Sequence, residues 1–265
     1  MRRRLASALA VCALSAAAAS PSLGGGSGED LLPDLDQAAP GRVEVVTTGR
    51  AGARRYAVGF GSAVDNLGAG PLLLTGRRPS EADETMTVDQ SVVRTDGGSR
   101  TIRLQATLRY VHSTTHRHWH LLPFERYELR RIGGSAPLRR DAKTGFCLGD
   151  RYRARRGLPN QPPAAVLVGE CGRDEPGLLS VGEGISVGYG DDYDPTLEGQ
   201  RIDVTGLPAG RYLLVHRVNG DRRLLESDYA NNTSSALLEL AWPGGRSSPP
   251  RVSVLRRCAS GARCG

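Results

Sequence analysis

The sequence predicts an all-β protein, an antiparallel β-sandwich in which long loops carry the functional site. Short runs with partial apolar–polar alternation recur along the chain, as expected for half-buried strands. No stretch of any length shows the periodicity of an amphipathic helix. The 34 glycines and 16 prolines among 265 residues divide the chain into short segments, which is typical of sheets joined by turns and loops.

Eight runs are expected to form strands, since each holds β-branched, aromatic or leucine side chains and is bounded by Gly, Pro, Asp or Asn. In chain order they span residues 42–46, 56–60, 91–94, 101–104, 126–130, 201–205, 211–218 and 235–240. Between the sixth and seventh runs, Gly206-Leu207-Pro208-Ala209-Gly210 has the composition of a turn, and it predicts a hairpin between them.

Residues 1–19 have the features of a secretory signal peptide. Arg2, Arg3 and Arg4 precede a short apolar stretch, and an Ala-x-Ala site ends near Ala19. The stretch is too short to span a bilayer permanently, so we expect a secreted protein with no stable membrane anchor. Residues 20–41 are expected to form a linker and anchoring segment, residues 42–243 the main domain, and residues 244–265 a Gly-, Pro- and Arg-rich tail.

Export makes disulfides the default state of the remaining cysteines, because the extracellular environment is oxidising. Four remain after the signal peptide, namely Cys147, Cys171, Cys258 and Cys264. Proximity in the sequence favours Cys147 with Cys171 and Cys258 with Cys264, although four cysteines allow three connectivities. No Cys-x-x-Cys pair is present, which argues against a zinc ribbon or a thioredoxin-like site.

The charge of the chain does not indicate a nucleic-acid partner. The formal net charge is +7, and removal of the signal peptide leaves about +4 on the mature chain. The arginines are scattered, with no basic stripe interleaved with aromatic residues. Of the 35 basic residues only Lys143 is a lysine, and it is therefore the one side chain that offers an amine nucleophile.

Four of the five histidines lie between His112 and His120. His116, His118 and His120 are spaced two apart, so an extended strand would place the three rings on one face, roughly 7 Å apart at Cα. Imidazole is the commonest metal ligand, and the row predicts a metal site, with copper and zinc both possible. Arg117 and Trp119 would lie on the other face, against solvent or core.

Five blocks of residues follow one another along the chain, and they are His116-Arg117-His118-Trp119-His120, Lys143-Thr144-Gly145-Phe146-Cys147-Leu148, Gly190-Asp191-Asp192-Tyr193, Gly199-Gln200-Arg201-Ile202-Asp203-Val204-Thr205 and Glu226-Ser227-Asp228-Tyr229-Ala230-Asn231-Asn232. In this order they resemble the catalytic domain of the lysyl oxidase family, most of all its bacterial secreted members. The resemblance covers roughly residues 30–240 and is strongest from His116 onward. It implies that residues 42–243 form a lysyl oxidase-like, copper-binding catalytic domain.

The resemblance also implies roles for single residues. His116, His118 and His120 match the copper ligands of the family, and copper(II) suits imidazole. Lys143 and Tyr193 match the two residues that cross-link into the cofactor lysine tyrosylquinone. The implied activity is oxidative deamination of a primary amine, either a lysine in a protein or peptide or a small amine, by molecular oxygen, with release of aldehyde, hydrogen peroxide and ammonia.

Other residues near the blocks have less defined roles. Asp191, Asp192, Asp194 and Glu198 surround Tyr193 in the sequence, and they are expected to form an acidic mouth that attracts a cationic amine. His112 is expected to support the metal site through a hydrogen bond to a ligand ring or carboxylate. His216 lies in an apolar run and is expected to be structural.

Two alternatives remain open at this point. One is an exported copper- or zinc-binding β-sandwich without catalysis, for which the pair Lys143 and Tyr193 would have no use. The other is an adhesion module of the same fold with an accidental histidine cluster. Gly199 and Arg201 stand where animal members of the family have a cysteine and a tryptophan, which leaves the identity of the substrate open.

Overall fold

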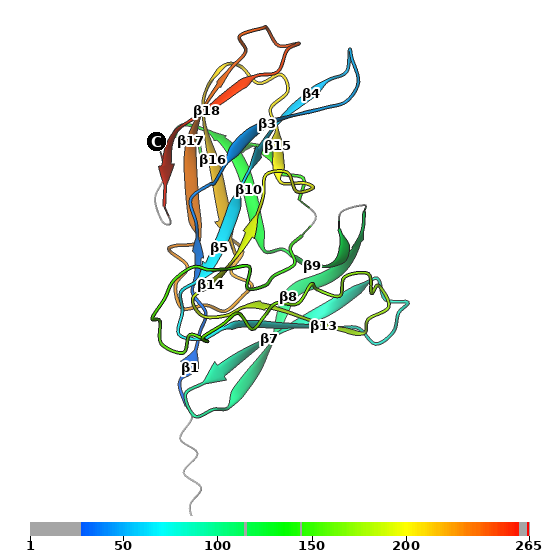
Figure 1. The fold of residues 1–265 in the computed structure, drawn as a ribbon, viewed down its shortest axis with the longest axis vertical. Coiled ribbons are helices and arrows are strands. Elements are labelled where there is room, and N and C mark those ends of the chain that lie inside the picture. Colours follow the sequence, from blue (N-terminus) through cyan, green and yellow to red (C-terminus); the bar gives the residue numbers. More distant parts are fainter. Residues whose placement is uncertain (1–27, 114–115, 144, 260–263, 265) are drawn as a thin grey trace, which may run out of the picture.

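The computed structural model describes residues 28–113, 116–143, 145–259 and 264 (Figure 1). In this part of the chain strands make up all of the regular secondary structure, and every strand pair is antiparallel. The predicted all-β, antiparallel fold class is therefore confirmed. The predicted signal peptide, residues 1–19, lies outside the described residues.

The largest sheet carries the histidine row at one edge. Its order is β13 (Ser180–Ile185), β6 (Leu72–Arg77), β7 (Thr85–Arg94), β8 (Ser99–His112) and β9 (Arg117–Leu122), with β1 (Asp30–Leu31) beside β7. Figure 1 shows this sheet lying across the lower end of the others. Both β13 and β9 are thus edge strands of this sheet.

Three further sheets stand above it. The five-stranded sheet has the order β11 (Pro137–Arg140), β10 (Glu125–Arg131), β16 (Gly210–Val218), β17 (Thr233–Ala241) and β18 (Arg251–Cys258). The four-stranded sheet has the order β12 (Tyr152–Arg153), β14 (Tyr189–Tyr193), β5 (Ser62–Asn66) and β2 (Leu35–Gln37). The smallest sheet consists of β15 (Arg201–Asp203), β4 (Arg55–Phe60) and β3 (Val43–Thr48).

All eight predicted runs overlap strands, because alternation and β-branched residues mark half-buried strands well. The predicted hairpin at Gly206–Gly210 is wrong. The segment does connect β15 to β16, but β15 pairs with β4 whereas β16 pairs with β10 and β17. The turn therefore carries the chain from one sheet to another. The strand β18 lies in the tail whose composition gave no sign of it.

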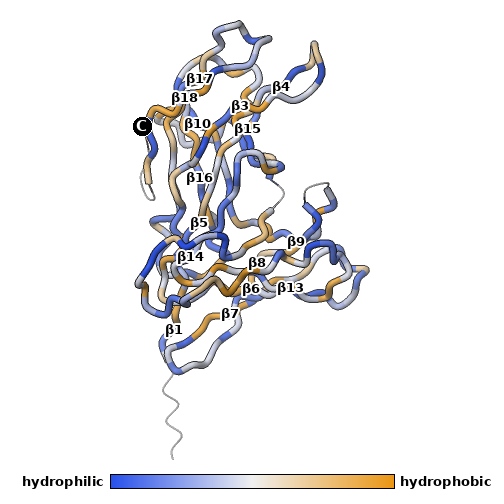
Figure 2. Tube along the Cα trace, viewed as in Figure 1, coloured by the Kyte–Doolittle hydropathy of each residue, from blue (hydrophilic) through white to orange (hydrophobic). Residues whose placement is uncertain are grey.

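One hydrophobic core joins the sheets. Aromatic side chains from three segments meet in it, with Phe60 and Tyr127 at 4.8 Å between ring centroids and Phe124 and Phe146 at 5.6 Å. Trp119 is fully buried in the same core. Figure 2 shows apolar residues gathered along β6, β8 and β13 and polar residues in many of the loops. The core thus fixes the relative position of β9, β10 and the loop that contains Phe146.

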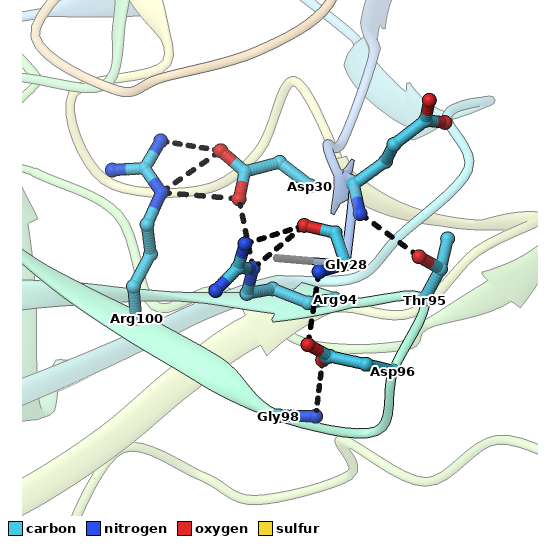
Figure 3. A network of polar contacts seen from close by, with 8 residues as sticks. Gly28, Asp30, Arg94, Thr95, Asp96, Gly98 and Arg100 are labelled. Carbon is cyan, nitrogen blue, oxygen red and sulfur yellow. Dashed lines mark hydrogen bonds and ion pairs between the residues drawn. The ribbon is translucent and has the colours of Figure 1, made fainter. Parts of the chain in front are cut away.

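The start of the described chain is fastened to the β7–β8 hairpin (Figure 3). Arg100 Nε donates to Asp30 Oδ2 at 2.8 Å, and Arg94 Nε donates to the carbonyl oxygen of Gly28 at 2.9 Å. Asp96 accepts the N–H groups of Gly28 and Gly98. The hydrogen bonds from Arg100 lower the pKa of Asp30, as expected for a carboxylate that accepts charge-assisted bonds.

Two disulfides close loops in different parts of the chain. Cys147 bonds to Cys171, and Cys258 bonds to Cys264, which is the pairing favoured by sequence proximity. None of the described residues belongs to a helix long and apolar enough to cross a membrane.

Candidate active site

The histidine row lies where edge strand β9 meets the core. β8 pairs with β9 so that Val111 is opposite His118 and His112 is opposite Arg117. Because side chains alternate along a strand, His118 and His120 share one face and Arg117 and Trp119 the other. Arg117 is exposed and Trp119 is in the core, as the spacing predicted.

The free edge of β9 is covered by two loops. Leu121 exchanges backbone hydrogen bonds with Phe146, at 2.7 and 3.2 Å, and Trp119 N–H donates to the carbonyl oxygen of Cys171 at 2.9 Å. These bonds satisfy backbone groups that an edge strand would otherwise leave unpaired. The disulfide between Cys147 and Cys171 joins the two loops. The loop that follows Lys143 is therefore held against the histidine row.

The three rings converge on one point. A nitrogen from each of His116, His118 and His120 lies within 4.8 Å of the others, and His118 Nε2 is 2.7 Å from His120 Nε2. All three side chains are buried. Burial lowers the pKa of His118 to about 4 and lowers that of His116 as well, so both rings are neutral at neutral pH and keep a lone pair for a metal.

His116 supplies the clearest sign that a ligand is needed here. Both of its ring nitrogens are buried, and neither has a hydrogen-bond partner in the described part of the chain. A buried polar atom without a partner costs about 1–3 kcal/mol. A metal ion bound to His116, His118 and His120 would give one nitrogen of His116 a partner, so the residues present fit a metal.

Lys143 is held beside the row by its own backbone. Its N–H donates to Asp141 Oδ1 at 2.8 Å, and Asp141 Oδ2 accepts the N–H of Tyr127 at 2.9 Å. Gly199 approaches so closely that a Cβ there would lie 2.7 Å from Lys143 Cα, and its φ of +76° also favours glycine. Gly199 therefore lets its loop pack against Lys143.

The side chain of Lys143 reaches the ring of Tyr193. Its Nζ lies 4.4 Å from the Tyr193 ring centroid and 5.3 Å from that of Phe146. The nitrogen is shielded from solvent and has no hydrogen-bond partner among the residues described. Burial lowers the pKa of Lys143 to about 8, since the charged form loses its hydration. A sizeable fraction of neutral amine is thus available at mildly alkaline pH.

Tyr193 is fixed at the end of β14. Its hydroxyl donates to Asp191 Oδ2 at 2.6 Å and contacts the carbonyl oxygen of Cys147 at 3.3 Å. Asp191 and Tyr193 are two residues apart on one strand and therefore point to the same face. Burial raises the pKa of Asp191 to about 8, and burial together with the carboxyl of Asp191 raises the pKa of Tyr193 well above its ordinary value.

These groups line one cavity of about 200 Å³. The lining residues come from β9, β14 and the loops that cover them, and they are His116, His118, His120, Lys143, Gly145, Cys147, Arg151, Glu170, Arg173, Asp191, Asp192, Tyr193 and Leu197. The structure therefore brings together all five residues that the family resemblance selected, although the chain separates His116 from Tyr193 by 77 positions.

The expected acidic mouth is only partly present. Asp192 is exposed at the cavity, but Asp191 is buried beneath it against Tyr193. Asp194 instead pairs with Arg42 at 3.1 Å, and the carboxylate of Glu198 accepts the hydroxyl of Ser113 at 2.7 Å. Strand alternation at Asp191–Tyr193 explains why neighbouring acids have different surroundings.

Two expectations for the other histidines have different outcomes. His112 is exposed, and its ring packs on Tyr110 at 4.6 Å. Because it lies opposite Arg117, it points away from the face of His118, and the expected support of a ligand ring is wrong. His216 is fully buried between Phe60 and Tyr127, as expected for a structural residue.

The cavity is also lined by three charged residues to which the sequence analysis assigned no role, namely Arg151, Glu170 and Arg173. Arg151 Nε lies 3.5 Å from Asp191 Oδ1, and Arg173 pairs with Glu170. Arginine is so frequent in this chain that composition could not single out these two. Their positions depend on the disulfide between Cys147 and Cys171, next to which all three residues lie.

The fold and the site together define a class of protein: an all-β domain with a three-imidazole candidate metal site beside a buried tyrosine and a lysine whose Nζ is shielded from solvent. A family model described as "Lysyl oxidase" matches residues 90–241, which is more than half of the chain and includes all five site residues. The chain therefore belongs to the lysyl oxidase family.

Individual relatives are more distant and much longer. The chain is 32% identical over 122 residues to lysyl oxidase homolog 2 of Gallus gallus, covering 44% of this chain and 13% of the relative. It is 31% identical over 118 residues to lysyl oxidase homolog 2A of Danio rerio, and 30% identical over 118 residues to lysyl oxidase homolog 4 of Homo sapiens, each covering 44% of this chain and 14% of the relative. The matches thus span only a small part of these relatives.

Proposed function

We propose that this chain is an exported, copper-dependent amine oxidase. Its substrates are primary amines, either peptidyl lysine or small amines, which it converts to aldehydes with release of hydrogen peroxide and ammonia. One observation carries the proposal: three buried imidazoles, the only lysine of the chain and a buried tyrosine line the same cavity. A protein that only stored metal would have no use for the lysine and the tyrosine.

The donor set of the cavity fits copper(II). Imidazole nitrogen is a good ligand for copper, which stands at the top of the divalent affinity order. His116, His118 and His120 would hold the ion, each through one ring nitrogen, and the ion would give a partner to one of the two unpartnered nitrogens of His116. Copper held there would supply the one-electron and oxygen chemistry that oxidises a neighbouring phenol.

Lys143 and Tyr193 fit the lysine tyrosylquinone of the family. Arginine could not replace Lys143, because only the neutral amine of a lysine adds to an oxidised ring. Asp191 Oδ2 accepts the hydroxyl proton of Tyr193 and so sets the rotation of the ring, while Phe146 packs against it at 5.1 Å between centroids. The quinone, once formed, would act as the electron sink for amine oxidation.

Burial of this pair has a chemical consequence. The hydroxyl of Tyr193 and Nζ of Lys143 are both out of contact with bulk water, which protects a reactive ring from side reactions. The buried carboxyl groups Asp191 and Glu125 face Lys143 closely enough to raise its pKa against the effect of burial. They therefore keep the pKa of Lys143 at about 8 rather than lower. The hydroxyl of Tyr193 carries the proton that it donates in the hydrogen bond to Asp191.

The cysteines support export as part of the proposal. Disulfides persist in oxidising compartments and are rare in the cytosol, and all four cysteines after the predicted signal peptide are paired. We propose that the mature protein is secreted, with its amine substrate and molecular oxygen supplied outside the cell.

The test is the covalent bond itself. The full chain is loaded with copper under oxygen, digested, and searched by mass spectrometry for a joined peptide that contains Lys143 and Tyr193, with the quinone absorbance recorded in parallel. Lys143→Arg is the matched control and should give neither signal. Peroxide production from n-butylamine should appear only in samples that contain the joined peptide.

The same experiment distinguishes the oxidase from the alternative, a metal-binding protein without catalysis. A non-catalytic metal-binding protein would bind copper or zinc through the three histidines without forming a joined peptide under oxygen. That result, with metal bound in stoichiometric amount, would overturn the oxidase proposal.

A further inference from the structure

Asp191 and Arg151 form a charged pair next to the hydroxyl of Tyr193. The hydroxyl donates to Asp191 Oδ2 at 2.6 Å, and Arg151 Nε lies 3.5 Å from Asp191 Oδ1. The two carboxyl oxygens therefore have different partners, a phenol on one side and a guanidinium on the other. All three side chains line the catalytic cavity.

The pair is built from two segments that are fixed against each other. Asp191 and Tyr193 lie two apart on β14 and share one face. The N–H of Arg151 donates to the carbonyl oxygen of Gly190 at 2.9 Å, and its guanidinium donates to the carbonyl oxygen of Gly169 at 3.3 Å. Although 31% of the Arg151 side chain is exposed, these bonds hold the residue beside β14.

Asp191 is the buried member of the pair. Only 1% of its side chain is exposed, and within the described part of the chain Arg151 is the only residue with which it forms an ion pair. Burial raises the pKa of Asp191 to about 8, while the hydrogen bond from Tyr193 and the charge of Arg151 act in the opposite direction. Arg151 therefore extends the ionised state of Asp191 to lower pH.

Other ionisable groups face this pair without contacting the carboxyl oxygens. They are Glu125 of β10, Tyr152 of β12, Glu183 of β13, Asp192 of β14, Lys143 and the ring of His118, which faces Arg151. Among the residues that the structure describes, only Tyr193 and Arg151 bond to or pair with the Asp191 carboxyl. The charge of Arg151 is thus the one positive charge in direct contact with it.

Oxidation of a phenol to a quinone requires that its hydroxyl proton leave. Two acceptors lie next to the Tyr193 hydroxyl, Asp191 Oδ2 and the carbonyl oxygen of Cys147 at 3.3 Å. A peptide carbonyl is not a base at ordinary pH, whereas a carboxylate is. Lys143 is unsuited to this task, because a proton on Nζ would occupy the lone pair with which the amine adds to the ring.

We propose that Asp191 accepts the hydroxyl proton of Tyr193 when the ring is oxidised, and that Arg151 holds Asp191 in the ionised state that this transfer requires. The O–H bond of Tyr193 breaks, an O–H bond forms at Asp191 Oδ2, and the electron passes to copper(II), the oxidant of the function proposed above. Asp191 touches the reacting hydroxyl and is a catalytic residue, whereas Arg151 acts through Asp191 and is a positioning residue. The catalytic role rests on the proposed amine oxidase function, but the coupling between Arg151 and Asp191 does not.

The coupling is measured first in metal-free protein. Protein labelled with ¹³C at the aspartate carboxyl groups is titrated with base, and Asp191→Asn assigns the signal of Asp191. We expect Arg151→Gln to raise the midpoint pH of this signal by about 1, because it removes the only ion-pair partner, and Arg151→Lys, which keeps the charge, to reverse most of that change. Arg173→Gln is the matched control, since Arg173 lines the same cavity but pairs with Glu170. An unchanged midpoint in Arg151→Gln would overturn the role of the arginine.

Formation of the bond between Lys143 and Tyr193 then tests the catalytic role. Copper-loaded protein is kept under oxygen at several pH values, and the joined peptide is quantified over time by mass spectrometry. Asp191→Asn should give no joined peptide at any pH while it binds copper like the parent chain, because an amide cannot take up the proton. Arg151→Gln should form the joined peptide about tenfold more slowly at pH 7, with a difference that shrinks as the pH rises and ionises Asp191 without the arginine. A slowing that is equal at every pH would show a merely structural role and contradict the proposal.

The outcomes distinguish this proposal from the function on which it rests. If the parent chain forms no joined peptide under any condition, the oxidase function fails and the catalytic role of Asp191 fails with it, while the titration still decides whether Arg151 controls Asp191. If the parent chain and Asp191→Asn form the joined peptide at equal rates, the oxidase function stands and Asp191 is not the proton acceptor.

Discussion

Two buried histidines in different sheets show how position determines what an imidazole does. His118 lies on edge strand β9 and His216 on β16, which has a paired strand on each side. Burial is the largest cause of a lowered pKa in both, to about 4 in His118 and about 3 in His216. Yet His118 faces a cavity with two further imidazoles and Lys143, whereas His216 packs between the rings of Phe60 and Tyr127.

The difference comes from what covers each strand. A central strand is paired on both edges, and its inward side chains meet the packed core. An edge strand needs loops to satisfy its free backbone groups, and here those loops bring Lys143 and the disulfide to β9. The loops that cover β9 leave a cavity beside His118. Around His216 on β16 the packed core fills the space instead. Four predictions, from the largest expected effect to the smallest, test this comparison.

Replacing Lys143 should have the largest effect. Lys143→Arg keeps the charge and Lys143→Met keeps the length without it, and neither supplies an amine that adds to an oxidised ring. We expect both variants to bind copper like the parent chain and to produce no peroxide from n-butylamine. Copper is measured by metal analysis after desalting and peroxide by a coupled assay. Appreciable peroxide from either variant would contradict the role of Lys143.

The two histidines should separate clearly in copper binding. His118→Ala is expected to lower copper affinity at least ~100-fold, because even partners of metal ligands contribute ~10–100-fold. His216→Leu should leave copper affinity unchanged and keep the free energy of unfolding within about 1 kcal/mol, since it replaces a buried ring that lacks partners by an apolar side chain. Competition titration with a chelator gives the affinities. Loss of copper binding in His216→Leu would contradict the assignment of His216 as a core residue without a role in the metal site.

Removing each disulfide in turn tests which of the two supports activity. The bond between Cys147 and Cys171 joins the loops over β9, whereas the bond between Cys258 and Cys264 closes a loop at the end of β18. In the loop-entropy relation, the separations of 24 and 6 residues correspond to about 3 and about 2 kcal/mol of stability. We expect Cys147→Ala with Cys171→Ala to reduce peroxide production as well, because the pair holds the loops beside Lys143. Cys258→Ala with Cys264→Ala should affect stability only. Equal loss of activity in both double variants would contradict the assignment.

Much of this fold was predictable because the relevant signals are local. Alternating residues marked strands such as β10 and β16, and the spacing of His116, His118 and His120 by itself implied a shared face. The strands β13 and β14 gave no signal, since runs such as Ser180–Ile185 and Tyr189–Tyr193 are rich in Gly or Asp, which have low strand propensity. Pairing with β6 and β5 makes them strands.

The sequence selected the residues that line the candidate site, but it did not predict their surroundings. Family resemblance selected Lys143 and Tyr193, but only the tertiary structure places Nζ 4.4 Å from the ring. In the sequence, Asp191 belongs to an acidic loop that water would be expected to surround. In the structure it is buried, because β14 pairs with β5 and turns alternate side chains inward. Burial of this kind depends on partners that are distant in the chain.

Acid titration should give the smallest effect and the most direct contrast between the two histidines. An unfolded histidine has a pKa near 6.5, whereas folded His216 has a pKa of about 3, so the unfolded chain binds more protons as the pH falls below 6.5. At pH 7 the protonation of His216 therefore has little effect on the free energy of unfolding. As the pH falls from 6.5 toward 3, His216 lowers this free energy progressively. Between pH 7 and pH 5 this loss is about 2 kcal/mol.

His216→Leu should therefore lose about 2 kcal/mol less than the parent chain over that interval, measured by urea unfolding of metal-free protein at both pH values. All other titrating groups, including His118 and the buried carboxyls, are common to both proteins and cancel in the difference. Copper should protect against the contribution of His118, because a bound ring cannot take up a proton at the ligating nitrogen, but it should leave the contribution of His216 unchanged. Parallel stability curves for the two proteins would mean that His216 is protonated in the folded state, and the contrast between a core histidine and a ligand histidine would then rest on geometry alone.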